Sequence, residues 1–464
     1  MKKLFTLAIL ITFGTVLGQC VEVFPAGNAT FIKYPNGDFW ATGQNNGAFG
    51  NGTTASSLVF VPLGNDNDWR KIVSKSHNLL IKTNGTLWGW GNNDYGELGN
   101  SDTSYKNSPI LMSADTDWID IKTGLNHSLA LKSNGTIWSC GRNNFGQLGL
   151  GNIVNNPTLT QVGIDTDWAK IETYGNLSFA IKNNGTLWMW GYTYNGQAGN
   201  GSVTVFDPAL RTTPQQIGND NDWNEVRANP EAVVALKNNG TLWAWGGNLQ
   251  GSLGDGTTNS CFFPRQLGSA NDWTAIEGLS NFTALKNDGS LWVWGINNFG
   301  FAGLGNNNLT FIFTPTHVGS AGNCIRIEKN FWNTAVLHQD GKYYIWGSNQ
   351  QGQIGNGTTT NVYTPTLLTV ACNLDLEKNN KNLSTITTTP NPTDGIVNID
   401  LTNNAVQTAS IKIFNSLGQE INVQDKIPFI NNKTTIDLTN HSSGIYFLKI
   451  STDTQQQTIK IIKQ

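Results

Sequence analysis

The chain has 464 residues, of which 13% are charged, with 51 glycines, 17 tryptophans and a formal net charge of −3. Many glycines and aromatic residues with few charges favour short strands and tight turns, so we expect an all-β protein. The small net charge, without blocks of like sign, argues against nucleic acid as a partner and against a polybasic membrane anchor.

Residues 1–18 have the pattern of a secretory signal peptide. Two lysines precede a largely apolar run that ends in Gly18, and the run is too short and wrongly flanked for a spanning helix. We expect cleavage after Gly18. The alternative is lipidation of Cys20, although Gln19 is not the small residue that a lipoprotein signal places before its cysteine. No other run reaches about 18 apolar residues, so we predict no transmembrane segment.

A repeated segment dominates residues 19–372. Its core reads Leu-Lys-x-Asn-Gly-Thr-Leu-Trp-x-Trp-Gly, and each copy reads as four short strands, with Asn-Gly at the turn between the second and third. The two tryptophans leave the same face of a strand, and a single unit cannot bury both. We therefore predict a seven-bladed β-propeller of about 50-residue repeats. The closing glycines are Gly43, Gly91, Gly141, Gly191, Gly246, Gly295 and Gly347.

These motifs resemble the regulator of chromosome condensation repeat family. Its Gly-x-x-His-Ser-Leu-Ala-Leu segment is matched at residues 124–131, and its Gly-x-Asn-x-x-Gly-Gln-Leu-Gly segment at residues 141–149. The resemblance spans roughly residues 20–372 and implies a seven-bladed propeller. Among the departures from the pattern, Thr42 stands where the second tryptophan is expected, Tyr344 replaces the first tryptophan of the last copy, and only His77 and His127 keep the histidine.

Six aromatic residues are the candidate binding residues. Strand order places the loops between strands one and two on the same side as those between strands three and four, and this side collects aromatic residues. Aromatic anchors on one face suit a protein or glycan ligand. The alternative is that the rings pack beneath their own loops. The six are Tyr95, Phe145, Phe299, Tyr194, Phe331 and Trp332.

No arrangement of catalytic or metal-binding residues stands out, and we predict no cofactor and no enzymatic activity. The repeated Asp-x-Asp-Trp element, as at Asp115 and Asp117, offers a carboxylate pair to calcium, but turn capping is the simpler interpretation. His77 and His127 share a repeat position, where we expect structural hydrogen bonds. The alternative is an extracellular enzyme whose site is assembled from loops of several blades.

The composition changes after Cys372. Residues 373–389 are polar and lack aromatic residues, which predicts a linker. From residue 390 onward, apolar residues alternate in four segments, which predicts a small β-sandwich. The four segments are residues 396–401, 410–414, 433–438 and 445–450.

This tail, residues 390–464, resembles the C-terminal sorting domain of the bacterial type IX (Por) secretion system. The matching residues are Pro390-Asn391-Pro392, Gly395, residues 414–419, Gly444-Ile445-Tyr446 and the basic end at 460–463. The resemblance implies passage through the inner membrane, then recognition by the type IX machinery and removal of the tail at the outer membrane. Both ends of the chain therefore predict an extracellular protein, either secreted or on the outer cell surface.

A disulfide between Cys20 and Cys372 is expected to close the ring. Cys20 precedes Gly43 by 23 residues, as Trp118 precedes Gly141, and Cys372 follows the last strand of the seventh copy. Both cysteines thus fall on the connection where the ring ends meet, and export permits oxidation. The alternatives are two unpaired thiols, or Cys324 as a partner.

The sequence as a whole predicts an exported, non-enzymatic binding or scaffold protein that engages an unknown protein or glycan through one propeller face. Nucleotide exchange on a small GTPase, which the family resemblance brings to mind, conflicts with export.

Overall fold

The computed structural model describes residues 21–64, 68–193, 195–201, 210–305, 310–319, 323–369, 386–390, 393–401, 408–415, 420–428, 433–451 and 456–463. The predicted signal peptide at 1–18 lies outside these residues, as do Cys20, Cys372, Tyr194 and most of the predicted linker. The chain divides into two compact units, residues 1–370 and 371–464, and each is described by itself. Among the described residues, no helix is long and apolar enough to cross a membrane.

Within its described residues, the first unit forms seven sheets of four antiparallel strands that pair in chain order. Blade one comprises β1 (Glu22–Ala26), β2 (Ala29–Lys33), β3 (Phe39–Gly43) and β4 (Ser57–Pro62). Blade two comprises β5 (Trp69–Ser74), β6 (His77–Lys82), β7 (Leu87–Gly91) and β8 (Lys106–Ser113). Blade three comprises β9 (Trp118–Thr123), β10 (His127–Lys132), β11 (Ile137–Gly141) and β12 (Asn156–Gln161). Blade four comprises β13 (Trp168–Tyr174), β14 (Leu177–Lys182), β15 (Leu187–Gly191) and β16 (Arg211–Gln216).

The remaining three blades repeat this plan. Blade five comprises β17 (Trp223–Ala228), β18 (Ala232–Lys237), β19 (Leu242–Gly246) and β20 (Cys261–Gln266). Blade six comprises β21 (Trp273–Gly278), β22 (Asn281–Lys286), β23 (Leu291–Ile296), the short 3-10 helix η1 (Asn298–Gly300) and β24 (Phe311–His317). Blade seven comprises β25 (Cys324–Lys329), β26 (Asn333–His338), β27 (Tyr343–Gly347) and β28 (Val362–Leu367). The predicted all-β fold of seven blades is confirmed.

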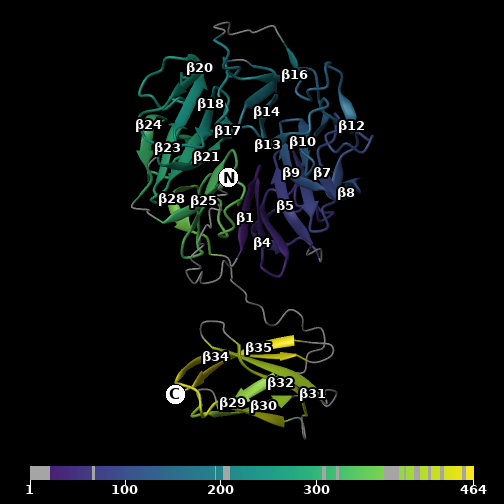
Figure 1. The fold of residues 1–464 in the computed structure, drawn as a ribbon, viewed down its shortest axis with the longest axis vertical. Helices are drawn as coiled ribbons and strands as arrows, with labels where there is room; N and C mark the ends of the chain where they lie inside the picture. The colour runs from purple at the N-terminus through teal and green to yellow at the C-terminus, as the bar shows by residue number, and fades with distance from the viewer. Residues whose placement is uncertain are drawn as a thin grey trace, which may run out of the picture. The chain divides into compact units, whose positions relative to one another are not determined.

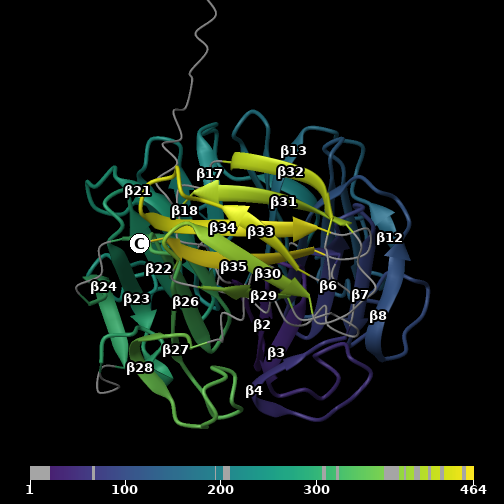
Figure 2. The same cartoon turned by 90° about the horizontal axis from the view of Figure 1, so that it is seen from below.

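The seven sheets close into a ring. The first strands of neighbouring blades lie at its centre and contact one another all the way round, including β25 against β1 (Figure 1). Strands β8, β12 and β24 lie at the rim (Figure 2). Blades one and seven are also joined by a buried hydrogen bond, in which the Thr42 hydroxyl donates to the Gly352 carbonyl oxygen at 2.9 Å. Each first strand therefore presents residues to the centre of the ring.

The second tryptophan of strand three locks neighbouring blades together, as its repeat position predicts. Trp245 is fully buried, and its indole nitrogen donates to the carbonyl oxygen of Gln197 in the preceding blade at 2.9 Å. A glycine makes room for each such ring. At Gly149 a Cβ atom would lie 2.8 Å from Nε1 of Trp190, and its φ of +72° also disfavours any side chain. The glycines of the repeat thus serve packing between blades.

The first tryptophan of strand three is half-buried, and it contacts a lysine of its own blade. In blade three, Nζ of Lys132 lies 4.7 Å from the ring centroid of Trp118 and 5.2 Å from that of Trp138. The same ammonium pairs with Asp115 at 2.6 Å and with Asp117 at 3.1 Å. The Asp-x-Asp carboxylates therefore hold a lysine between two indoles, and blades four and five repeat this arrangement.

The C-terminal unit consists of two sheets that share a core. Its shorter sheet has the order β29 (Ile386–Thr389), β30 (Ile396–Leu401) and β33 (Lys433–Asp437). Its longer sheet has the order β32 (Glu420–Pro428), β31 (Thr408–Asn415), β34 (Gly444–Ser451) and β35 (Gln456–Lys463) (Figure 2). Ile399 of the first sheet and Ile411 and Leu448 of the second belong to one buried cluster, which confirms a β-sandwich. Strand β29 occupies the last four residues of the segment predicted as a linker.

Candidate functional site

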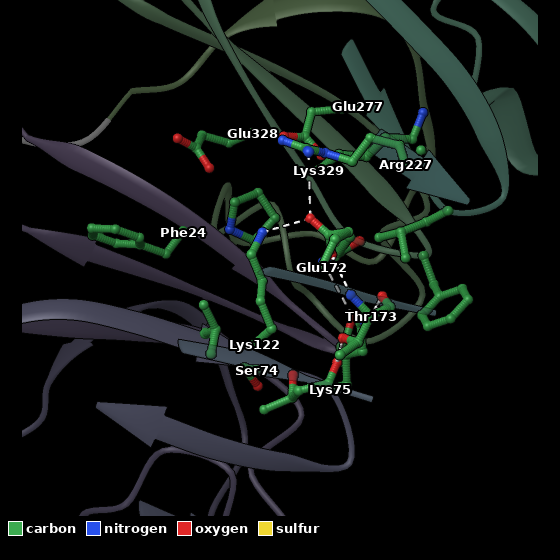
Figure 3. Close-up of a pocket in the computed structure, with 18 of the residues that line it drawn as sticks. Phe24, Ser74, Lys75, Lys122, Glu172, Thr173, Arg227, Glu277, Glu328 and Lys329 are labelled. Atoms are coloured by element: carbon green, nitrogen blue, oxygen red, sulfur yellow. Dashed lines mark hydrogen bonds and ion pairs between the residues drawn. The ribbon is translucent and has the colours of Figure 1, made fainter. Parts of the chain in front are cut away.

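A pocket lies at the centre of the ring, where the first strands of all seven blades end (Figure 3). Its cavity volume is about 150 Å³, and it is partly open to solvent. Corresponding positions of the seven strands differ in chemistry round this central pocket. Blades one and two contribute the apolar residues Phe24 and Val73, whereas blades three to seven contribute charged residues. The charged residues are Lys122, Glu172, Arg227, Glu277 and Glu328.

Four of these charged residues form a chain of ion pairs across three blade boundaries (Figure 3). Nζ of Lys122 lies 2.6 Å from Oε2 of Glu172, and Nη1 of Arg227 lies 3.4 Å from the same oxygen. Arg227 also donates through Nε and Nη2 to both carboxylate oxygens of Glu277, at 3.0 and 2.8 Å. This bidentate geometry fixes the orientation of the guanidinium group. The ion-pair chain Lys122–Glu172–Arg227–Glu277 is therefore internally compensated.

The surroundings in the central pocket shift the pKa values of two glutamates in opposite directions. Burial disfavours the charge of Glu172, but the charges of Lys122, Arg227 and Lys75 outweigh it and lower the pKa of Glu172 to about 2. Burial also acts on Glu328, whose partner Arg326 does not compensate fully, so that the pKa of Glu328 is raised to about 7. Two carboxylates in one pocket thus differ widely in their acidity.

Two lysines of the central pocket have only neutral partners within the described residues. Nζ of Lys75 donates to the carbonyl oxygen of Thr173 at 3.0 Å, and Nζ of Lys329 donates to the side-chain oxygens of Asn281 and Thr283. Burial lowers the pKa of Lys75 to about 8, against the attraction of Glu172. Burial likewise lowers the pKa of Lys329 to about 7. Each charged ammonium is therefore disfavoured where it lies.

Sequence reasoning missed this pocket, although the sequence contains a signal for it. In four successive copies, the fourth residue after the tryptophan of the Asp-Trp pair is charged. These residues are Lys122, Glu172, Arg227 and Glu277. Charge of alternating sign at one repeat position predicts contacts between neighbouring blades, since equivalent residues of a ring lie side by side. The repeat motif does not include this position, because the residue changes from each copy to the next.

Of the predicted aromatic residues, the structure brings Phe299 and Trp332 together. Their ring centroids are 6.4 Å apart, and Phe301 lies 5.8 Å from Phe299 and 6.1 Å from Trp332. Phe301 is buried, whereas Phe299 is 43% and Trp332 38% exposed. We call these three residues the aromatic cluster. It joins the η1 loop of blade six to the loop between β25 and β26 of blade seven, and the sequence analysis missed Phe301.

The other predicted aromatic residues lie elsewhere. Phe331 is half-buried, lies 6.1 Å from the ring of Tyr174 and lines the central pocket. Tyr95 and Phe145 are half-buried on either side of Arg142, whose Cζ lies 5.0 and 5.6 Å from their ring centroids. These two rings therefore take part in a cation–π stack within the propeller, apart from the aromatic cluster.

The two repeat-position histidines form hydrogen bonds between blades. Nε2 of His77 lies 2.7 Å from the Ser128 hydroxyl, and Nε2 of His127 lies 2.9 Å from the Ser178 hydroxyl. Both imidazoles are fully buried, and burial lowers the pKa of each to about 3. This confirms their structural role. In the part of the chain that the structure describes, no group of three or more histidine, cysteine or acidic side chains is placed to hold a metal ion.

Comparison with protein families identifies both parts of the chain. The model of the regulator of chromosome condensation (RCC1) repeat matches residues 84–131, 134–181, 239–285 and 340–374, and a second model of this repeat matches residues 118–147. The secretion system C-terminal sorting domain matches residues 388–464. The chain thus carries RCC1 repeats followed by a sorting domain of the type IX secretion system, and the sorting domain indicates export to the cell surface or the medium.

Individual proteins resemble the chain mainly in fold. A curated relative, protein RCC2 of Mus musculus, is 48% identical over 48 residues, which are 10% of this chain and 9% of that protein. The structure of human WBSCR16 has a TM-score of 0.58 at 23% identity and covers 68% of this chain and 85% of its own. Prp20p from Saccharomyces cerevisiae, described with its binding to Gsp1p and histones, has a TM-score of 0.64 at 17% identity, with coverages of 76% and 89%. At these identities the structures show a shared propeller fold.

Proposed function

We propose that this exported propeller is a non-enzymatic binding or scaffold protein, and that it engages an extracellular protein or glycan through the face that carries the aromatic cluster. The observation that carries the proposal is the pair of exposed rings of Phe299 and Trp332, which neighbouring blades hold edge to face. Rings of this size dominate the energetics of many interfaces, because each buries a large apolar area at little cost in side-chain entropy.

The position of Trp332 supports this role. It is the single tryptophan of the sequence outside the three repeated tryptophan positions. The packing of the propeller blades against one another therefore does not require a tryptophan here. Its backbone is fixed nonetheless, because its N–H donates to Oδ1 of Asn330 at 2.7 Å and its carbonyl oxygen accepts from the N–H of Ser348 at 2.9 Å. A rigid backbone that presents an exposed indole lowers the entropic cost of binding.

The second candidate function is an extracellular enzyme, and one observation favours it. Glu328 and Lys329 each have a pKa shifted to about 7, and both line the central pocket. Buried groups with shifted pKa values gather at many active sites, although structural ion-pair networks produce the same shifts. The ion-pair chain in this pocket favours the structural explanation.

The test is to probe arrays of glycans and of immobilised extracellular proteins with the protein recovered from outside the cell. We expect saturable binding to individual array members, and loss of that binding in the Trp332→Ala variant. The same preparation is assayed for hydrolysis of chromogenic ester, glycoside and peptide substrates. Turnover without binding to any array member, or binding that Trp332→Ala leaves unchanged, would contradict the proposal.

A further inference from the structure

We propose that the central pocket is a second binding site, which takes a carboxylate attached to an apolar or aromatic group, with the ammonium of Lys75 as its counter-ion. This site is distinct from the aromatic cluster and does not depend on the function proposed above. It is supported by the division of the pocket into an apolar and a charged half, and by the pairing of its carboxylates, which leaves Lys75 with a neutral partner only.

The apolar half of the pocket fits a hydrophobic group. Phe24 and Val73 stand where the other blades contribute charged residues, and Ile72, Leu279 and Phe331 extend this apolar wall. Apolar surface that lines an open pocket is stabilised when a ligand removes it from water. The ligand therefore carries an apolar or aromatic group on one side.

The pairing of the charges selects an anion as the other part of the ligand. The carboxylates of Glu172 and Glu277 are taken by Lys122 and Arg227, and the carboxylate of Glu328 pairs with Arg326. A cationic ligand would therefore have to displace an existing ion pair. Lys75 is different, because its ammonium has three donor hydrogens and its partner within the described residues is a single carbonyl oxygen.

The surroundings of Lys75 favour a single negative charge. Glu172 and Glu277 attract its ammonium, whereas Lys122 and Arg227 repel it, and Glu328 and Lys329 line the same pocket. A carboxylate adds one negative charge beside Lys75, which like Lys329 has only neutral partners within the described residues. A phosphate would add a second negative charge close to the carboxylates of the ion-pair chain, at a cost in repulsion. A carboxylate next to an apolar side chain occurs in free aromatic or aliphatic acids and at the carboxyl terminus of a peptide.

The first experiment is calorimetric titration of the exported protein with defined probes. The probes are N-acetyl-L-phenylalanine and its amide, and an N-acetylated tetrapeptide that ends in phenylalanine, with a free or an amidated carboxyl terminus. We expect both free acids to bind at least tenfold more tightly than their amides. A tetrapeptide acid that binds more than tenfold tighter than the single amino acid identifies a peptide terminus as the ligand, and equal affinities identify a small acid. Equal binding of acids and amides, or no binding at millimolar concentration, would overturn the proposal.

Variants test the role of Lys75. Lys75→Met keeps the length of the side chain and removes its charge, so we expect binding of the acid to weaken at least tenfold and that of the amide to stay unchanged. Lys75→Arg restores a cation and should recover part of the affinity. The matched control is Lys71→Met, because Lys71 lies on β5, the strand that Lys75 directly follows, but pairs with Asp120 and does not line the central pocket. Acid binding that survives in Lys75→Met would assign the site to other residues.

Proton uptake gives a readout that a purely structural role would not produce. Burial holds the pKa of Lys75 at about 8, and a bound carboxylate favours its charged form, so the pKa rises on binding. At pH 8 the protein should therefore take up protons with the acid, measured as a dependence of the binding enthalpy on the ionisation enthalpy of the buffer. Uptake that persists in Lys75→Met would contradict the assignment.

Discussion

Nζ of Lys75 in blade two donates a hydrogen bond to the carbonyl oxygen of Thr173 in blade four, at 3.0 Å. This contact joins two blades that are not neighbours in the ring and gives a partly buried cation a neutral partner. Burial without a carboxylate lowers the pKa of Lys75 from 10.5 to about 8. The folded propeller therefore accommodates a charge that would be more stable in water.

Lys75→Met is expected to stabilise the propeller at pH 7 by roughly 1–3 kcal/mol, because one pKa unit corresponds to about 1.4 kcal/mol. The pKa of Lys75 is lower in the folded state, so the unfolded chain binds more protons between pH 8 and 10.5. The stability contributed by Lys75 therefore rises over that range, and the advantage of the variant disappears near pH 10.5. Denaturant unfolding at several pH values measures this difference, and a variant that is less stable at pH 7 would contradict the prediction.

Glu172→Gln is expected to destabilise the propeller by roughly 2–4 kcal/mol, because it leaves Lys122 and part of Arg227 without a counter-charge. Its pKa is lowered from 4.5 to about 2, so its contribution is complete above pH 4.5 and is lost as pH falls toward 2. The variant should show a smaller loss of stability over that range. The control is Glu22→Gln, whose carboxylate lies 3.9 Å from Lys33 at the surface and should cost less than about 1 kcal/mol. Equal effects of the two variants would contradict the account.

Lys237→Met tests the lysine held between two indoles. Nζ of Lys237 lies 4.7 Å from the ring centroid of Trp223 and 4.4 Å from that of Trp243, and it pairs with Asp222 at 3.0 Å. We expect a loss of roughly 1–3 kcal/mol, since cation–π and partly buried ion-pair contacts are removed together. Thermal unfolding measures this loss of stability, and Lys342→Met, a change at an exposed lysine, is the control. A loss no larger than that of the control would show that the indoles stabilise the blade without the cation.

The predicted disulfide between Cys20 and Cys372 lies outside the described residues and stays a prediction. Peptide mapping of exported material without reduction should recover the two cysteines as one linked pair. Cys140, Cys261 and Cys324 are free and buried, and should be alkylated only after unfolding. Recovery of Cys20 or Cys372 as an alkylated free thiol, or a link to Cys324, would remove this closure of the ring.

The propeller could be predicted from the sequence because its determinants recur. The tryptophans of strand three and the glycines that accommodate them, such as Trp190 and Gly149, occupy fixed positions in a repeat of near-constant length. Wherever the second tryptophan is present, its ring must fit against the equivalent glycine of the neighbouring blade. The architecture therefore follows from a pattern that the sequence repeats, and the same holds for the hydrogen bonds of His77 and His127.

The central pocket could not be predicted in the same way, because its residues differ from blade to blade. That Glu172 pairs with both Lys122 and Arg227 depends on which blades are neighbours and on how far each side chain reaches. The aromatic cluster was predicted in part. Trp332 is an exception to the repeat and Phe299 occupies a repeated loop position, but the contact between their rings joins loops of two blades, which local sequence does not specify.

The most direct test of the proposed binding face compares two aromatic truncations in the exported protein, using an array member that the wild type binds. Trp332→Ala should weaken binding by at least about thirtyfold, as expected for an anchor that is buried in the complex and worth about 2 kcal/mol. The melting temperature of the free protein should stay nearly unchanged, because the Trp332 side chain is 38% exposed. Phe263→Ala, at a 58% exposed position on the rim strand β20, should leave both affinity and melting temperature unchanged. Unchanged affinity in Trp332→Ala, or a loss of stability of about 3–5 kcal/mol as for a core aromatic residue, would contradict the assignment of this face.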